Sequence, residues 1–164
     1  MASFENALRA VNELKDAGII EDCAVARAMA LVFWIEPIPT FDLDVLVLLP
    51  PTAGPHVSLD PIYRWAADRG YVAEHEHIYI EGVPVQFLPS FDALAEEAIR
   101  TAVDRQYFGV DLRVVRPEYL IALFLLPSAR TVKRRERAAA LRDSPSIDRE
   151  VLDDLMTRFK LTFS

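Results

Sequence analysis

The sequence predicts an α/β (or α+β) fold, in which a mixed β-sheet is flanked by helices and the C-terminal portion is helical. Three observations lead to this prediction. Residues 41–49 form a long apolar run rich in Val and Leu, which is typical of a buried strand. Shorter alternating runs indicate further strands, and segments with apolar residues at helical spacing lie between them. From about residue 116 only helical spacing remains, so the strands belong to the earlier part of the chain.

Capping and turn residues place the first elements. Apolar residues at helical spacing begin directly after Ser3, a suitable N-cap, and Gly18 can end this helix. A brief strand is predicted at 23–25 and an apolar helix at 26–35. Prolines then separate that helix from the strong strand at 41–49.

The next elements form a helix followed by a hairpin. Asp60 as N-cap and Pro61 at the first helical position predict a helix that ends at Gly70. Two strands are predicted at 72–80 and 83–88, joined by a tight turn at Glu81 and Gly82.

The last part of the chain combines one strand with several helices. We expect a helix at 90–102, a strand at 110–114, a helix at 117–126, a basic segment at 130–142 and a final helix at 147–159. Residues 1–164 are therefore expected to form a single domain, with a core over about 1–115 and C-terminal helices over about 116–164.

Composition narrows the function classes. A 164-residue chain with 52% hydrophobic residues is long enough to bury a substantial core, and a net charge of -7 argues against duplex DNA as a partner. One cysteine, Cys23, excludes a disulfide framework and a Cys-rich zinc site. The first fifteen residues are charged and amphipathic, and no apolar run approaches the roughly 20 residues that span a bilayer. We therefore expect no signal peptide, no membrane partner and a location in the cytoplasm.

The candidate chemistry begins at Asp42 and Asp44. Residues two apart on a strand point to the same face, about 7 Å from one another. Two carboxylates beside apolar neighbours repel each other and lose hydration, and a divalent cation removes that cost. Mg²⁺ favours one or two carboxylates together with phosphate oxygens. The pair therefore indicates either a Mg²⁺ (or Mn²⁺) site or the solvated start of a strand.

The surroundings of the pair favour the first interpretation. A short strand and an apolar helix precede the segment Thr40-Phe41-Asp42-Leu43-Asp44, and this order resembles the nucleotidyltransferase superfamily. The resemblance is strongest to small bacterial proteins akin to the AbiEii-type toxins of toxin–antitoxin systems. It implies a nucleotidyltransferase-like sheet, metal ions held by the two aspartates, an NTP whose triphosphate these ions align, and Thr40 in the nucleotide-binding segment.

The sequence departs from the family pattern in three places. Where the family has a glycine pair at the start of the helix, this sequence has Ala26-Arg27, and Arg27 either binds phosphate or fills the pocket. Gln86 stands where the resemblance places a third carboxylate, and it can still coordinate weakly. The C-terminal Lys-Asp pair of many relatives is Lys133-Arg134 here, which keeps the lysine on the phosphate side.

His77 is a candidate replacement for the third carboxylate. A two-residue turn at 81–82 pairs the flanking strands so that His77 lies opposite Gln86, on the same face as His75 and Tyr79. His77 then serves as a metal ligand or general base; the alternative is a half-exposed strand whose histidines meet water.

The basic segment allows two interpretations as well. Its cations either hold nucleotide phosphates, with Lys133 foremost, or form a solvated helix face. The resemblance implies a metal-dependent nucleotidyltransferase that moves a nucleotidyl group from an NTP to an RNA (such as tRNA) or protein hydroxyl, with an antitoxin as a further partner. The alternative is a catalytically impaired member of the fold that acts as a binding or regulatory partner.

Overall fold

The computed structural model describes residues 2–35, 41–51, 58–129 and 131–163. Within these residues the strands are β1 (Asp22–Ala26), β2 (Leu43–Leu48), β3 (Val72–Glu74), β4 (His77–Ile80), β5 (Val83–Pro89), β6 (Val103–Tyr107) and β7 (Val110–Val114). The helices are α1 (Phe4–Asp16), α2 (Arg27–Leu31), α3 (Asp60–Asp68), α4 (Ala93–Arg100), α5 (Pro117–Phe124), α6 (Val132–Arg142) and α7 (Arg149–Arg158), with a 3₁₀ turn at Pro127–Ala129.

The strands form a mixed seven-stranded sheet in the order β3-β4-β5-β2-β1-β7-β6. At its centre β2 pairs parallel with β5 and antiparallel with β1, and β1 pairs parallel with β7. β2 is buried along nearly its whole length, which explains its continuous run of Val and Leu. The mixed α/β sheet that the sequence predicts is confirmed.

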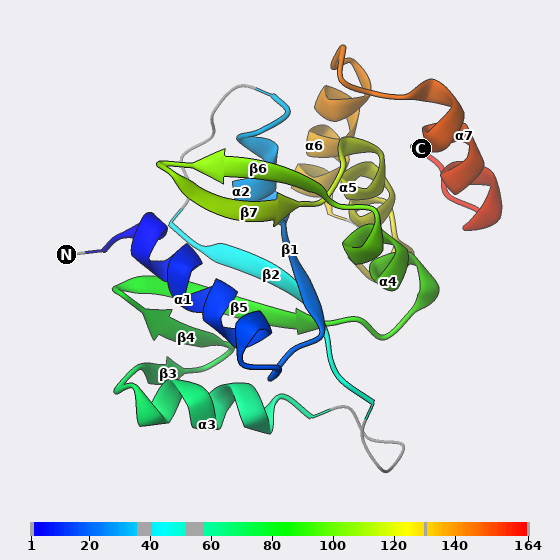
Figure 1. The fold of residues 1–164 in the computed structure, drawn as a ribbon. Coiled ribbons are helices and arrows are strands. Elements are labelled where there is room, and N and C mark those ends of the chain that lie inside the picture. The colour runs from blue at the N-terminus through cyan, green and yellow to red at the C-terminus, as the bar shows by residue number, and fades with distance from the viewer. Residues whose placement is uncertain (1, 36–40, 52–57, 130, 164) are drawn as a thin grey trace.

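Helices cover both faces of this sheet (Figure 1). α1 crosses one face: the Ser3 backbone N–H donates to Glu81 at the β4–β5 turn, and the Asn12 side chain donates to the Asp111 carbonyl on β7. α4 and α5 lie on the other face, and α5 also packs against α6 and α7. Figure 1 shows α4 to α7 gathered at one side of the sheet, as expected for a helical C-terminal portion.

Local capping agrees with the sequence at α1 and differs at α3 and α4. The Ser3 hydroxyl accepts the Asn6 N–H at the start of α1. Asp60 is the first residue of α3 rather than its cap: the N-cap is Leu59, and the Asp60 N–H donates to the Ser58 hydroxyl. α4 begins after Asp92, whose carboxylate accepts the Ala95 N–H, and not at residue 90.

Three strand and helix predictions are corrected. The apolar helix expected at 26–35 is helical only over Arg27–Leu31, and the backbone then continues as turns. The strand expected at 72–80 is divided into β3 and β4 by a turn in which His75 has a φ of 56°. β6 is absent from the prediction, because its three middle residues are all polar and exposed, and the strand therefore lacks the alternation of apolar and polar residues.

No helix in the described ranges is long and apolar enough to cross a membrane.

Candidate functional site

A row of site residues crosses the sheet on the α5 face. Ala26 on β1 pairs with Asp44 on β2, and Asp44 pairs with Gln86 on β5. The β4–β5 ladder pairs Ile78 with Val85, and one further step along it places His77 beside Gln86. Since partners on neighbouring strands share a face, the row brings these four positions to one side of the sheet.

Arg27 occupies the point where β1 turns into α2. Its φ is 54°, in the left-handed region that glycine adopts without strain. This is the position where the resemblance places a glycine, so the backbone retains a glycine-type conformation under an arginine side chain. The guanidinium lies over the row: Nη1 is 3.5 Å from the Gln86 Oε1 that accepts its hydrogen bond and 4.0 Å from Asp44 Oδ1.

A cavity of about 320 Å³ opens beside this row. Arg27, Asp42 and Asp44 line one side, and the α6 side chains Lys133, Arg134 and Arg137 line the other. Phe41 and Phe124 complete its aromatic part. The cavity therefore joins the start of β2 to the basic segment, with four cationic and two acidic side chains in its lining.

The charges in this cavity act on one another. Burial raises the pKa of the Asp44 carboxyl; Arg27 opposes this rise, and Asp42 adds to it. His77 and Arg134 also lower the pKa of Asp44, so both lie within electrostatic reach of it. Burial together with Arg27 and Arg137 lowers the pKa of Arg134. The repulsion between cations crowded in this way is relieved when an anion binds among them, so the cavity favours anionic ligands.

The two carboxylates are compatible with one divalent cation. Asp42 is exposed at the cavity, Asp44 has 13% of its side chain exposed, and ionising Asp44 is disfavoured by burial and by Asp42. A cation shared with phosphate oxygens would relieve both effects. Across the described ranges, no three His, Cys, Asp or Glu side chains gather to hold a metal by themselves. The donor set thus fits one ion whose coordination is completed by a phosphate-bearing ligand.

Most of the predicted site residues lie together. Arg27, Asp42, Asp44 and Lys133 line the cavity, and Gln86 reaches it through Arg27. His77 has 21% of its side chain exposed and lies at the end of the row, beside Glu76.

Two of the residues named from the sequence are not among these. One lies in a different place from the one predicted, and the other is outside the residues that the structure describes. His75 is in the β3–β4 turn and not on the strand face shared by His77 and Tyr79, because the long strand is broken there. Thr40 lies outside the described residues.

The structure places two further cations of the basic segment in the cavity beside Lys133. The sequence predicts for this segment as a whole either phosphate binding, with Lys133 foremost, or a solvated helix face, and Arg134 and Arg137 lie in the cavity lining. Helical spacing was the available signal, since positions 133, 134 and 137 fall on one side of a helix.

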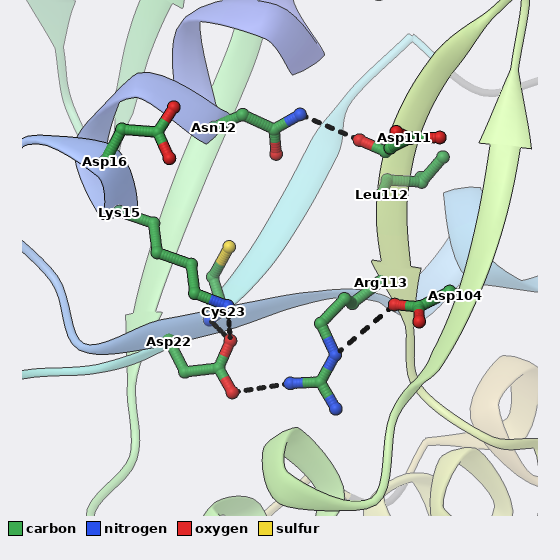
Figure 2. Close-up of a pocket in the computed structure, with 9 residues that line it drawn as sticks. All are labelled: Asn12, Lys15, Asp16, Asp22, Cys23, Asp104, Asp111, Leu112 and Arg113. Atoms are coloured by element: carbon green, nitrogen blue, oxygen red, sulfur yellow. Dashed lines mark hydrogen bonds and ion pairs between the residues drawn. The ribbon is translucent and has the colours of Figure 1, made fainter.

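A second polar cavity, of about 530 Å³, lies on the α1 face (Figure 2). Its central carboxylate, Asp22, accepts from Lys15 at 3.0 Å and is ion-paired with Arg113. Burial opposes ionisation of Asp22, but hydrogen bonds from Lys15, the Cys23 N–H and Arg113 outweigh it and lower the pKa. Burial raises the pKa of the Cys23 thiol to about 11, which keeps it protonated and unreactive. Figure 2 shows these ion pairs joining α1, β1 and β7, so this cavity contains a structural network.

The fold resembles that of solved nucleotidyltransferases. The antibiotic-resistance factor ANT(2'')-Ia in solution matches with a TM-score of 0.54 at 13% identity, covering 95% of this chain and 90% of that one. A crystal structure of ANT(2'')-Ia with adenylyl-2''-tobramycin matches with a TM-score of 0.55 at 15% identity, covering 94% and 93%. An antigenic nucleotidyltransferase-like protein from Paracoccidioides brasiliensis matches with a TM-score of 0.50 at 12% identity, covering 96% and 88%.

Searches with family models and against curated proteins found no match. At these identities the structural matches establish the fold: this chain has a nucleotidyltransferase-like fold along nearly its whole length.

Proposed function

We propose that this chain binds a nucleoside triphosphate in the 320 Å³ cavity and transfers its nucleotidyl group to an acceptor. One observation carries the proposal: the Asp42–Asp44 pair and four cationic side chains line a single cavity at the start of β2, within a nucleotidyltransferase-like fold. Carboxylates for a divalent cation and cations for phosphates are the two requirements of nucleotidyl transfer.

Each wall of the cavity has its own task in this proposal. Asp42 and Asp44 hold Mg²⁺ or Mn²⁺ when nucleotide is present, and that ion supplies charge neutralisation on the phosphates. The α6 side chains of Lys133, Arg134 and Arg137 bind the phosphate oxygens and hold the triphosphate in one orientation. Arg27 turns from Asp44 toward the phosphates, because they carry more negative charge than a single carboxylate.

The acceptor follows from the resemblance, which implies an RNA or protein hydroxyl and a role as the toxin of a toxin–antitoxin pair in the cytoplasm. A hydroxyl must lose its proton during attack, and His77 is the candidate base because it lies at the end of the Asp44–Gln86 row.

The test is transfer of α-labelled NTPs, with Mg²⁺ or Mn²⁺, onto total RNA and total protein. We expect label on one acceptor class with wild type, a loss of at least about 100-fold in Asp44→Asn, and no loss in Asp153→Asn, an exposed α7 aspartate. His77→Ala should lower turnover with little change in KM for the NTP. Absence of transfer above Asp44→Asn with all four nucleotides would contradict catalysis.

A second candidate is nucleotide binding without transfer. The Arg27 guanidinium against Asp44 and Gln86 favours it, because a resident cation already occupies the carboxylate that a metal would use. Calorimetry separates the two functions: ATP binding that is unchanged by EDTA, together with no transfer, identifies the binding protein.

A further inference from the structure

A third cavity, the apolar cavity, adjoins the 320 Å³ cavity lined by Asp42, Asp44 and the α6 cations, which we call the phosphate cavity. It has a volume of about 220 Å³ and lies between the sheet and α5. Its lining is mainly aliphatic and aromatic, and includes Leu46, Leu88, Leu120, Leu123, Phe124 and Leu126. Leu46 and Leu88 follow Asp44 and Gln86 by two residues on β2 and β5, so the apolar cavity continues the same face of the sheet.

Two guanidiniums stand at the junction of the two cavities. Arg27 and Arg134 line both, whereas Lys133 and Arg137 line only the phosphate cavity. No acidic side chain is among the described residues that line the apolar cavity. An occupant therefore meets an apolar wall along its body and positive charge where the two cavities join.

We propose that this cavity is a binding site for an apolar carboxylic acid, with its hydrocarbon part against α5 and its carboxylate on Arg27 and Arg134. Burial of the hydrocarbon supplies the driving force, and a guanidinium–carboxylate pair fixes the orientation. A nucleobase fits less well, because the described side chains of the lining offer its ring nitrogens and amino group no partner apart from the two arginines. A cationic ligand is repelled by both guanidiniums.

Because Arg27 and Arg134 line both cavities, binding of the acid should affect binding of the nucleotide. Arg27 and Arg134 cannot serve a carboxylate and a phosphate fully at the same time. The acid and ATP therefore weaken each other's binding to the same degree, as reciprocal linkage requires. The binding site itself does not depend on the proposed transfer; only this competition does.

The experiment is calorimetric titration of the full chain with octanoate, using octanol and octylamine as probes that differ only in the head group. We expect octanoate to bind at least about tenfold more tightly than either. Equal affinity for octanol, or no octanoate binding, would overturn the proposal.

Matched variants locate the site. Ala129→Leu fills the apolar cavity and should weaken octanoate at least about tenfold while leaving ATP unaffected. Arg134→Met should weaken both ligands, and Arg137→Met only ATP, because Arg137 lines the phosphate cavity alone. Octanoate binding that survives both Ala129→Leu and Arg134→Met in folded protein, checked by circular dichroism, would place the acid elsewhere and refute the assignment.

Competition completes the test. Saturating ATP should raise the apparent Kd of octanoate in wild type, and unchanged octanoate binding in the presence of bound ATP would refute the shared use of Arg27 and Arg134. If ATP does not bind at all, the proposed function fails while the octanoate titrations still decide the acid site.

Discussion

Arg27 combines a strained backbone with a charged side chain that contacts the site. A non-glycine residue at a φ of 54° costs about 1 kcal/mol or more relative to glycine. Arg27→Gly and Arg27→Ala both remove the guanidinium, but only the glycine variant also removes the strain. We expect Arg27→Gly to be more stable than Arg27→Ala by about 0.5–1 kcal/mol in urea unfolding.

The same two variants report on the metal site. Both free Asp44 from its nearest cation, so Mn²⁺ affinity measured by electron paramagnetic resonance should rise several-fold in each, and Arg27→Lys should stay near wild type. If Arg27→Ala were at least as stable as Arg27→Gly, the glycine-type conformation assigned to residue 27 would be wrong.

At the scale of elements, Glu118 connects α5 to α7. Its side chain is buried, with 1% exposed; Oε2 accepts the Asp148 N–H at the start of α7, and Oε1 lies 3.2 Å from the Arg116 guanidinium. Glu118→Ala removes the acceptor of the Asp148 N–H and the charge that faces the partly exposed Arg116, and it should lower the free energy of unfolding by about 2 kcal/mol. Glu118→Gln keeps an acceptor for Asp148 and should lose about half as much. Equal losses in the two variants would show that the carboxylate charge beside Arg116, and not the hydrogen bond from Asp148, is the contribution that Glu118 makes.

The sequence predicts a helix, strand or turn correctly where a local feature, such as a continuous apolar run, a proline or a glycine, specifies it. The strong strand, the start of α5 at Pro117 and the turn after Ile80 follow from burial or backbone chemistry, and the turn also gave the register that brings His77 toward Gln86. β6 was missed because an edge strand with exposed polar residues lacks the apolar period.

The cavity was only half predictable. Asp42 and Asp44 form a local motif, but the approach of α6 depends on how α5 packs on the sheet, which no local pattern encodes. The same holds for the apolar cavity, whose lining includes residues of β1, α2, β2, β5, α5, α6 and the 3₁₀ turn that follows α5.

At the scale of the whole molecule, charge is distributed unevenly. The chain carries a net charge of -7, yet its phosphate cavity has four cationic and two acidic side chains. Phosphate binding there should be strongly dependent on salt: we expect ATP affinity to fall by roughly tenfold between about 0.05 and about 0.5 M NaCl, because screening weakens exposed charge pairs. Adenosine, which lacks phosphates, is the control. Equal salt dependence for the two ligands would argue against recognition of the phosphates.

The ion-pair network on the opposite face makes stability depend on pH. Asp22 joins Lys15 of α1 to Arg113 of β7, and its pKa is lowered from an ordinary value of 3.8. A lowered native pKa contributes stability above the unfolded pKa, and that contribution is lost as the pH falls through the native one. Asp22→Asn should therefore cost about 1–2 kcal/mol in urea unfolding near pH 7, and this difference should shrink steadily below about pH 4. Asp16→Asn, in the same cavity, is the control and should change stability little at either pH. If the cost of Asp22→Asn were the same at both ends of this range, the network would stabilise the fold through packing alone, and the carboxylate charge would contribute nothing.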